Sequence, residues 1–120
     1  MKLADEVKAK INEIHPALVA TADRTGKPNV SPKGSLRVLD DEHLLFADIS
    51  SPRTIKNIWE NPQVAVICLD AKGKKGCRIW GNAEVFGSGP LFLQEFNKFA
   101  QKEMRVNHIV KIHVTDFESF

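Results

Sequence analysis

A hydroxyl-rich turn at the start of a short helix carries the residues best suited to chemistry in this sequence. Ser51 is a suitable N-cap, because its hydroxyl can accept a hydrogen bond from a first-turn amide, and Pro52 fits the first helical position. Arg53 and Thr54 add a guanidinium and a hydroxyl beside free backbone N–H groups and the positive end of the helix dipole. These residues predict an anion site that suits a phosphate group.

The helix itself is expected to span 52–60 and to pack on a core. Its apolar residues follow the i, i+3, i+4 spacing of one helical stripe: Ile55, Ile58 and Trp59. Asn57 lies off this stripe and is free for a polar role. An ordinary surface helix with a solvated Arg53 would show the same pattern, so the helix alone leaves both interpretations open.

An irregular strand supplies a second candidate position. Pro32 cannot donate to a sheet ladder and Gly34 weakens one, so this part of the strand expected over 29–39 is a bulge or an edge. Lys33 stands between them. It is either a solvent-facing lysine or a cation placed near an anionic or electron-rich ligand.

The elements that must position these residues are mostly strands joined by tight turns. Turn residues 23–28 and 40–43 each connect two strands as a hairpin. Gly81 is typical either of a bend at a barrel corner or of a simple packing glycine. Helices are expected over 2–14, 52–60 and 90–104, the last with Leu93, Phe96 and Phe99 on its apolar side. Strands are expected over 17–22, 29–39, 44–49, 63–69, 77–86 and 108–115. We therefore predict a mainly β, six-stranded antiparallel barrel with flanking helices, in a single domain over 1–120.

Composition and charge narrow the classes of function. The net charge is +2, which indicates no strong polyanion partner, although lysines cluster in the loop 70–76. No apolar run is long enough to span a membrane, and the charged amphipathic start is unlike a signal sequence. We expect a cytoplasmic protein without a membrane partner.

Cysteine and histidine spacing predicts no metal site. Cys68 lies within an apolar run and is expected to be a core residue, and its separation from Cys77 matches no zinc or redox motif. His108 and His113 would face opposite sides of a strand, so they cannot chelate one ion together.

The run 30–66, VSPKGSLRVLDDEHLLFADISSPRTIKNIWENPQVAV, resembles the core of the pyridoxamine 5′-phosphate oxidase-like FMN-binding split-barrel family. The shared pattern is a strand, a polar turn, Arg-Thr, a short helix, Asn-Pro and an apolar strand. Chain length and the outer elements also resemble short members of the family. The resemblance implies a split barrel that binds FMN as a homodimer, with the flavin at the subunit interface.

The resemblance also implies which residues contact the cofactor. The phosphate positions are Arg53 and Thr54, assisted by Ser51. The backbone along the isoalloxazine ring belongs to Asp48, Ile49 and Ser50. The polar edge of the ring meets Ser31, Pro32 and Lys33. The region that approaches the partner's flavin contains Arg105 and Asn107. Asn57 is a further cofactor-binding candidate from its position off the apolar stripe, not from the resemblance.

A flavin would supply hydride or electron transfer, which fits the lack of an evident general base, and we assign no catalytic residue. The expected function is an FMN-dependent oxidoreductase or electron carrier with a small-molecule or redox partner. The substrate motifs of the full-length oxidase, which contain further arginines, do not occur up to Phe120, so pyridoxamine phosphate oxidation is not expected.

Other classes remain open. A deazaflavin (F420) reductase uses a similar barrel, and a non-enzymatic barrel could store or sense flavin or haem. A nucleic-acid-binding barrel would show exposed aromatic residues among basic ones, whereas tyrosine is absent and most phenylalanines have helical core spacing. We therefore expect no nucleic-acid partner.

Overall fold

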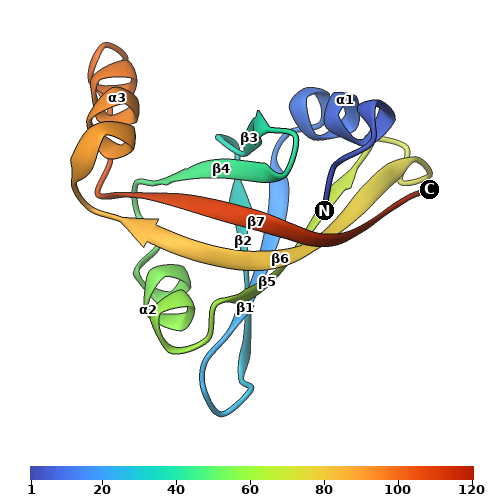
Figure 1. Cartoon of the computed structure of the whole chain (residues 1–120), viewed down its shortest axis with the longest axis horizontal. Helices are drawn as coiled ribbons and strands as arrows, with labels where there is room; N and C mark the ends of the chain where they lie inside the picture. Colours follow the sequence, from blue (N-terminus) through green and yellow to red (C-terminus); the bar gives the residue numbers. More distant parts are fainter.

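The computed structural model describes all residues, 1–120, as three helices around one antiparallel sheet (Figure 1). The elements in chain order are α1 (Asp5–Glu13), β1 (Ala17–Ala22), β2 (Pro28–Lys33), β3 (Arg37–Asp40), β4 (His43–Asp48), α2 (Pro52–Glu60), β5 (Gln63–Leu69), β6 (Gly76–Phe86), α3 (Gly89–Ala100) and β7 (His108–Ser119). None of the three helices combines the length and the apolar character that crossing a bilayer requires.

The sheet has seven strands in the order β2-β1-β5-β6-β7-β4-β3. The predicted antiparallel split barrel is confirmed, but the predicted number of strands, six, is wrong. The strand expected over 29–39 is two strands, β2 and β3, which lie at opposite edges of the sheet and do not pair. Of the residues between them, Gly34 is exposed and Leu36 is fully buried. The irregularity predicted around Pro32 and Gly34 therefore marks the point where the barrel is split.

The main core fills the barrel beneath α1 and α2. Alternation places Ala17 and Val19 of β1 inside and Leu18 outside. Cys68 is a core residue, as predicted, and pairs directly across the sheet with the equally buried Cys77. Nineteen residues form this core, and each large aliphatic side chain in it contributes about 1.5–3 kcal/mol on burial.

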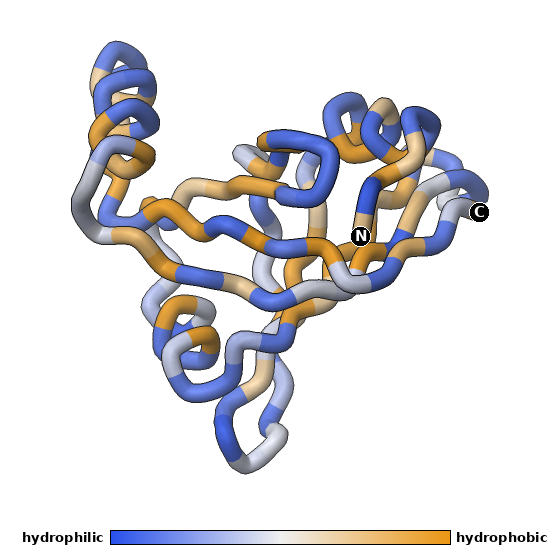
Figure 2. The backbone as a smooth tube through the Cα atoms, in the orientation of Figure 1, coloured by the Kyte–Doolittle hydropathy of each residue, from blue (hydrophilic) through white to orange (hydrophobic).

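A second, smaller cluster lies under α3, whose tube alternates between hydrophilic and hydrophobic segments in Figure 2. Leu45, Ala47, Val106 and Ile109 are its buried members, and Phe96 and Phe99 pack against them. Leu93 is 55% exposed, so its predicted place on the packed side of the helix is wrong.

Gly81 lies at a bend and is also closely packed, so both interpretations of this glycine hold. The register between β6 and β7 shifts between Trp80 and Gly81, which is a β-bulge. A Cβ atom at Gly81 would lie 2.4 Å from the carbonyl oxygen of His113. Only a residue without a side chain allows this approach.

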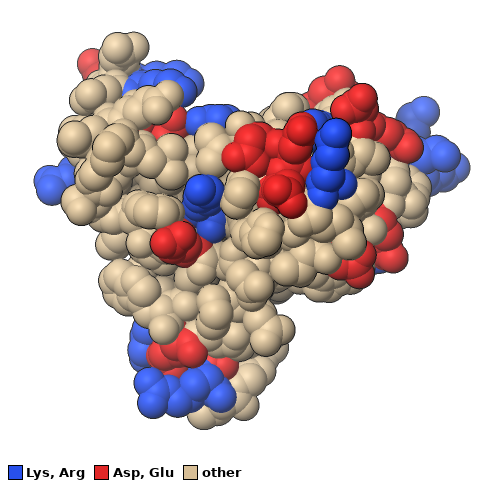
Figure 3. All heavy atoms as spheres, in the orientation of Figure 1, with Lys and Arg blue, Asp and Glu red and all other residues tan.

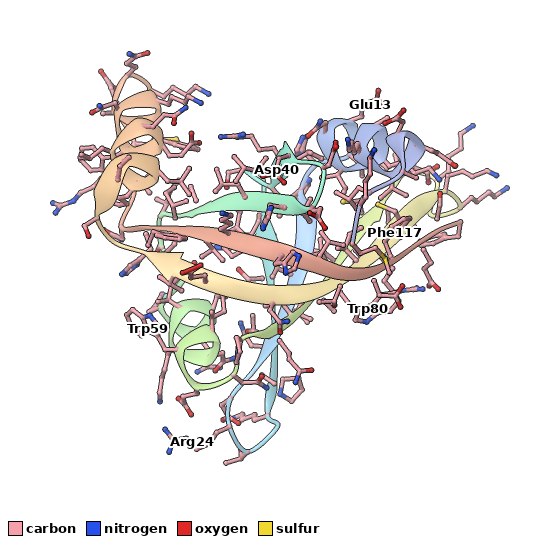
Figure 4. All side chains as sticks on the ribbon, viewed as in Figure 1. Glu13, Arg24, Asp40, Trp59, Trp80 and Phe117 are labelled. Carbon is pink, nitrogen blue, oxygen red and sulfur yellow. The ribbon has the colours of Figure 1, made fainter.

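Helix α2 differs from its predicted packing. Ile55 and Ile58 are buried, but Trp59 is 66% exposed and stands beside α2 in Figure 4. Its ring meets the ring of His108 edge-on, with the centroids 5.6 Å apart. The prediction that Trp59 packs on the core is wrong, because β7 brings a polar side chain to that side of the helix.

Candidate functional site

A chain of hydrogen bonds joins β2, the turn before α2 and β7. Lys33 Nζ donates to Ser51 Oγ at 2.6 Å, and Ser51 Oγ donates to Asp48 Oδ1 at 2.5 Å. The Ser51 N–H also donates to Asp48 Oδ1, at 2.9 Å. The other carboxylate oxygen, Oδ2, lies 2.8 Å from His108 Nδ1. Both oxygens of Asp48 are thus engaged, and the lysine is held on the far side of the serine.

These groups are withdrawn from solvent, which affects their ionisation. Burial by itself raises the pKa of Asp48, but hydrogen bonds from Ser51 and His108 outweigh it and hold that pKa below its usual value. Burial lowers the pKa of Lys33, and the charge of Asp48 opposes that change. Lys33 is only 7% exposed, and its Nζ lies 5.4 Å from the centre of the Phe46 ring. The interpretation of Lys33 as a solvent-facing lysine is wrong.

Ser51 occupies the N-cap position of α2, but the prediction that its hydroxyl caps the helix is wrong. Because the hydroxyl donates to Asp48, only the Ser51 carbonyl serves the helix, accepting from the Ile55 N–H at 3.2 Å. The N–H groups of Arg53 and Thr54 therefore have no acceptor within the chain. The helix start presents free donors, which is what an anion site requires.

Two hollows meet at this turn. The smaller, about 300 Å³, is lined by Ser31, Ser50, Ser51, Arg53 and Thr54 among others. The larger, about 700 Å³, includes Ser31, Pro32, Lys33, Ile49 and Ser50 in its wall. They share Ser31 and Ser50, so the anion-receptive helix start opens beside a larger cavity. Thr54 is almost fully buried beside the smaller hollow.

The remaining predicted residues lie around this centre. Asn107 holds the turn from the β7 side: its Nδ2 donates to the Ile49 carbonyl at 2.9 Å, and its N–H donates to the Asp48 carbonyl at 2.8 Å. Arg105 is exposed and lines neither hollow.

Asn57 is not free for a polar role, contrary to the prediction, because it is buried and donates to Thr21 Oγ1 at 3.1 Å. Asn57 and Arg53 both belong to the lining of a third hollow of about 420 Å³.

His108 is the main residue that the sequence did not indicate. It begins β7 directly opposite Asp48 of β4, and this register brings the imidazole to the carboxylate. The two residues are 60 positions apart, so no local spacing signals their contact.

Comparison with known proteins finds similarity over nearly the whole chain. A family model described as pyridoxamine 5′-phosphate oxidase matches residues 3–118. The uncharacterized protein MJ0282 of Methanocaldococcus jannaschii is 34% identical over 121 residues, covering 97% of this chain and 79% of that protein. The crystal structure of HupZ from Group A Streptococcus is 30% identical with a TM-score of 0.88, covering 98% of this chain and 94% of HupZ.

Two more distant structures share the fold alone. One is an FMN-binding protein from Syntrophomonas wolfei, with 15% identity, a TM-score of 0.80, and coverage of 95% of this chain and 86% of that one. The other is HutZ, the haem storage protein of Vibrio cholerae, with 18% identity, a TM-score of 0.74, and coverage of 99% and 95%. Similar barrels are therefore named for different cofactors.

Proposed function

The chain belongs to the pyridoxamine 5′-phosphate oxidase family, and from this membership and the geometry of the turn before α2 we propose that it is an FMN-binding flavoprotein. One observation carries the proposal. The helix start with free N–H groups at Arg53 and Thr54 opens beside a cavity of about 700 Å³, and the two hollows share Ser31 and Ser50. A ligand with a phosphate tail and a broad flat body fits this shape.

Each part of the site has a distinct role in this proposal. The phosphate is bound by the free amides of α2 together with the Arg53 guanidinium and the Thr54 hydroxyl. The ring lies along Ile49 and Ser50, and Asn107 holds the Ile49 carbonyl in place. Lys33 faces the polar edge of the ring, where its charge stabilises negative charge on a reduced flavin.

The chemistry follows from what the chain supplies and what it lacks. When bound, FMN supplies hydride or electron transfer, and the protein supplies orientation and electrostatics. Neither Asp48 nor His108 lines the large cavity, so neither is placed there as a general base. We therefore propose an oxidoreductase or electron carrier. Its two cysteines are free, which suits the reducing conditions of the cytoplasm.

We also infer that two copies associate through the outer face of β1 and β2, next to the proposed flavin. The outward positions of these strands carry no charged residue. Leu18 and Val30 are 42% and 62% exposed, and they adjoin Pro32 and Ala20 across the strand pair. An exposed apolar sheet face of this kind is typical of a protein interface. Ser31 and Lys33 alternate with these residues on β2, so the flavin would lie at the subunit boundary.

Reconstitution tests the proposed cofactor. The purified protein is titrated with FMN, and binding is followed by the change in the visible flavin spectrum and by quenching of flavin fluorescence. We expect saturable binding of one FMN per chain. Tighter binding of F420 or haem than of FMN in parallel titrations would replace the proposed cofactor, and no binding of FMN would refute the assignment.

A further inference from the structure

The Asp48 carboxylate is held by donors from two segments that are distant in sequence. Ser51 donates twice to Oδ1, through its N–H and its hydroxyl, and His108 Nδ1 lies 2.8 Å from Oδ2. An ionised carboxylate only accepts hydrogen bonds, so Nδ1 carries the proton in this contact. The Asp48 side chain is 4% exposed, and its one ion pair is with His108. His108 is thus the sole donor within the chain to one oxygen of a buried carboxylate.

The imidazole of His108 is itself kept in place by its neighbours. His108 pairs directly with Asp48 across the ladder of β4 and β7, and the Asn107 N–H holds the Asp48 carbonyl at 2.8 Å. The imidazole also meets the ring of Trp59 edge-on, with the centroids 5.6 Å apart. The surface between α2 and the start of β7 is largely uncharged in Figure 3. Trp59, which does not pack on the core, therefore helps to keep this ring directed at Asp48.

The charge that depends on this arrangement is that of Lys33. Its Nζ carries three protons and donates one of them to Ser51 Oγ at 2.6 Å. The charge of Asp48 acts on Lys33 across the serine, where it opposes the lowering of the Lys33 pKa by burial. Without His108, one oxygen of a buried carboxylate would lose its donor, which is unfavourable. The Lys33 ammonium is the buried cation that can replace that donor.

We propose that His108 is a positioning residue, which holds Asp48 in place and so keeps the Lys33 ammonium from pairing with that carboxylate. Lys33 then stays on the Ser51 hydroxyl, and its charge remains available in the wall of the large cavity. His108 does not line that cavity and acts only through the other side chains. The effect on a flavin rests on the proposed function, because a lysine paired with a carboxylate would stabilise a reduced ring less.

The first test needs no cofactor. The pKa of Lys33 is measured by NMR from the carbon shifts of isotope-labelled lysine side chains, and Lys33→Met assigns the signal. His108→Phe keeps a ring beside Trp59 but removes the donor. We expect the pKa of Lys33 to rise in this variant, because the ammonium gains a carboxylate partner. His108→Asn, whose amide can donate in place of Nδ1, should restore the wild-type value, and His113→Phe, exposed on the same strand, should leave it unchanged.

The second test uses bound FMN. In His108→Phe the preference of the protein for reduced over oxidised FMN should fall about threefold, which is about 14 mV at about 30 mV per tenfold change for a two-electron couple. The same substitution made in Lys33→Met should leave the potential unchanged, because no ammonium remains to be displaced. A merely structural role of His108 would shift the potential equally in both backgrounds.

An unchanged Lys33 pKa in His108→Phe, or equal shifts of the potential with and without Lys33, would overturn the proposal. The nitrogen shifts of His108 in the wild type give a test that needs no variant to fold. They should show a proton on Nδ1, and a neutral ring protonated at Nε2 alone would also overturn the proposal. A failure of FMN to bind would refute the flavin assignment, while the NMR titrations without FMN would still decide whether His108 positions Lys33.

Discussion

Lys33 Nζ and Ser51 Oγ lie 2.6 Å apart, and this hydrogen bond ties the edge strand β2 to the turn before α2. Because Ser51 gives its own hydroxyl proton to Asp48, its oxygen is left as an acceptor that faces the lysine. The serine therefore acts as a spacer: it keeps the ammonium close to a carboxylate without a direct ion pair. The positive charge remains available to the cavity.

Lys33→Met tests this use of the charge. The substitution keeps most of the side-chain volume and removes the cation, so negative charge on a reduced flavin loses stabilisation. We expect the two-electron reduction potential of bound FMN to fall by about 30 mV, which corresponds to about 1.4 kcal/mol. Spectroelectrochemical titration measures it. An unchanged potential would remove Lys33 from the ring environment, and Lys56→Met, outside the large cavity, serves as the control.

Asp48 makes stability depend on pH. Its pKa is lower in the folded protein than in the unfolded chain, so its stabilising contribution is present at neutral pH and is lost as the pH falls through the folded-state pKa. Asp48→Asn should lower the free energy of unfolding by about 1–3 kcal/mol at neutral pH and by less below about pH 4.

Urea unfolding of the wild type, of Asp48→Asn and of the exposed Asp116→Asn gives these values across the pH range. A penalty for Asp48→Asn that stays constant down to the lowest pH would show that the carboxylate charge contributes nothing to stability. Asp116→Asn should behave as the wild type does.

Gly81→Ala tests the bulge between β6 and β7. The added methyl would lie 2.4 Å from a backbone oxygen of His113 and 2.7 Å from a side-chain carbon of Ile112, so the strands must separate. We expect a loss of about 2 kcal/mol or more in the free energy of unfolding. Gly34→Ala is the matched control, since nothing lies within 4 Å of the new methyl there. Equal thermal stability of the two variants would contradict the close approach.

The proposed dimer is tested at its most exposed position. Val30→Glu places a charge on the outer face of β2 and should convert a dimer to a monomer in sedimentation equilibrium. Leu93→Glu changes a similarly exposed apolar residue on α3 and should leave the dimer intact. A wild-type protein that is monomeric, or a dimer that survives Val30→Glu, would refute this interface.

Local patterns predicted the barrel well, because hairpin turns, strand alternation and special glycines act over a few residues. The break between β2 and β3 was visible only as an irregularity at Pro32 and Gly34. That it separates the two sheet edges depends on how the whole barrel closes. Trp59 was placed wrongly because helical spacing cannot show that β7 brings His108 against that side of α2.

In the candidate site, too, local features were predicted and contacts between distant parts of the sequence were not. The turn carrying Arg53 and Thr54 was recognised from adjacent residues, whereas the true partner of the Ser51 hydroxyl was not. The Ser51 hydroxyl can bond either to a helix amide or to a carboxylate. It bonds to Asp48, whose carboxylate is held in place by His108, 60 positions away in the sequence. The ion pairs of Glu95 with Arg37 and Lys98 were not predicted, because Arg37 and Glu95 lie far apart in the sequence.

The most direct test of the account compares the affinities of FMN and riboflavin, which differ by the phosphate alone. The dissociation constants of both are measured for the wild type and for the double variant Arg53→Ala/Thr54→Val. We predict that the variant binds FMN about a hundredfold more weakly, roughly 2.7 kcal/mol, and binds riboflavin as the wild type does. Equal losses for the two ligands, or no loss for FMN, would contradict the assignment of the phosphate to the start of α2.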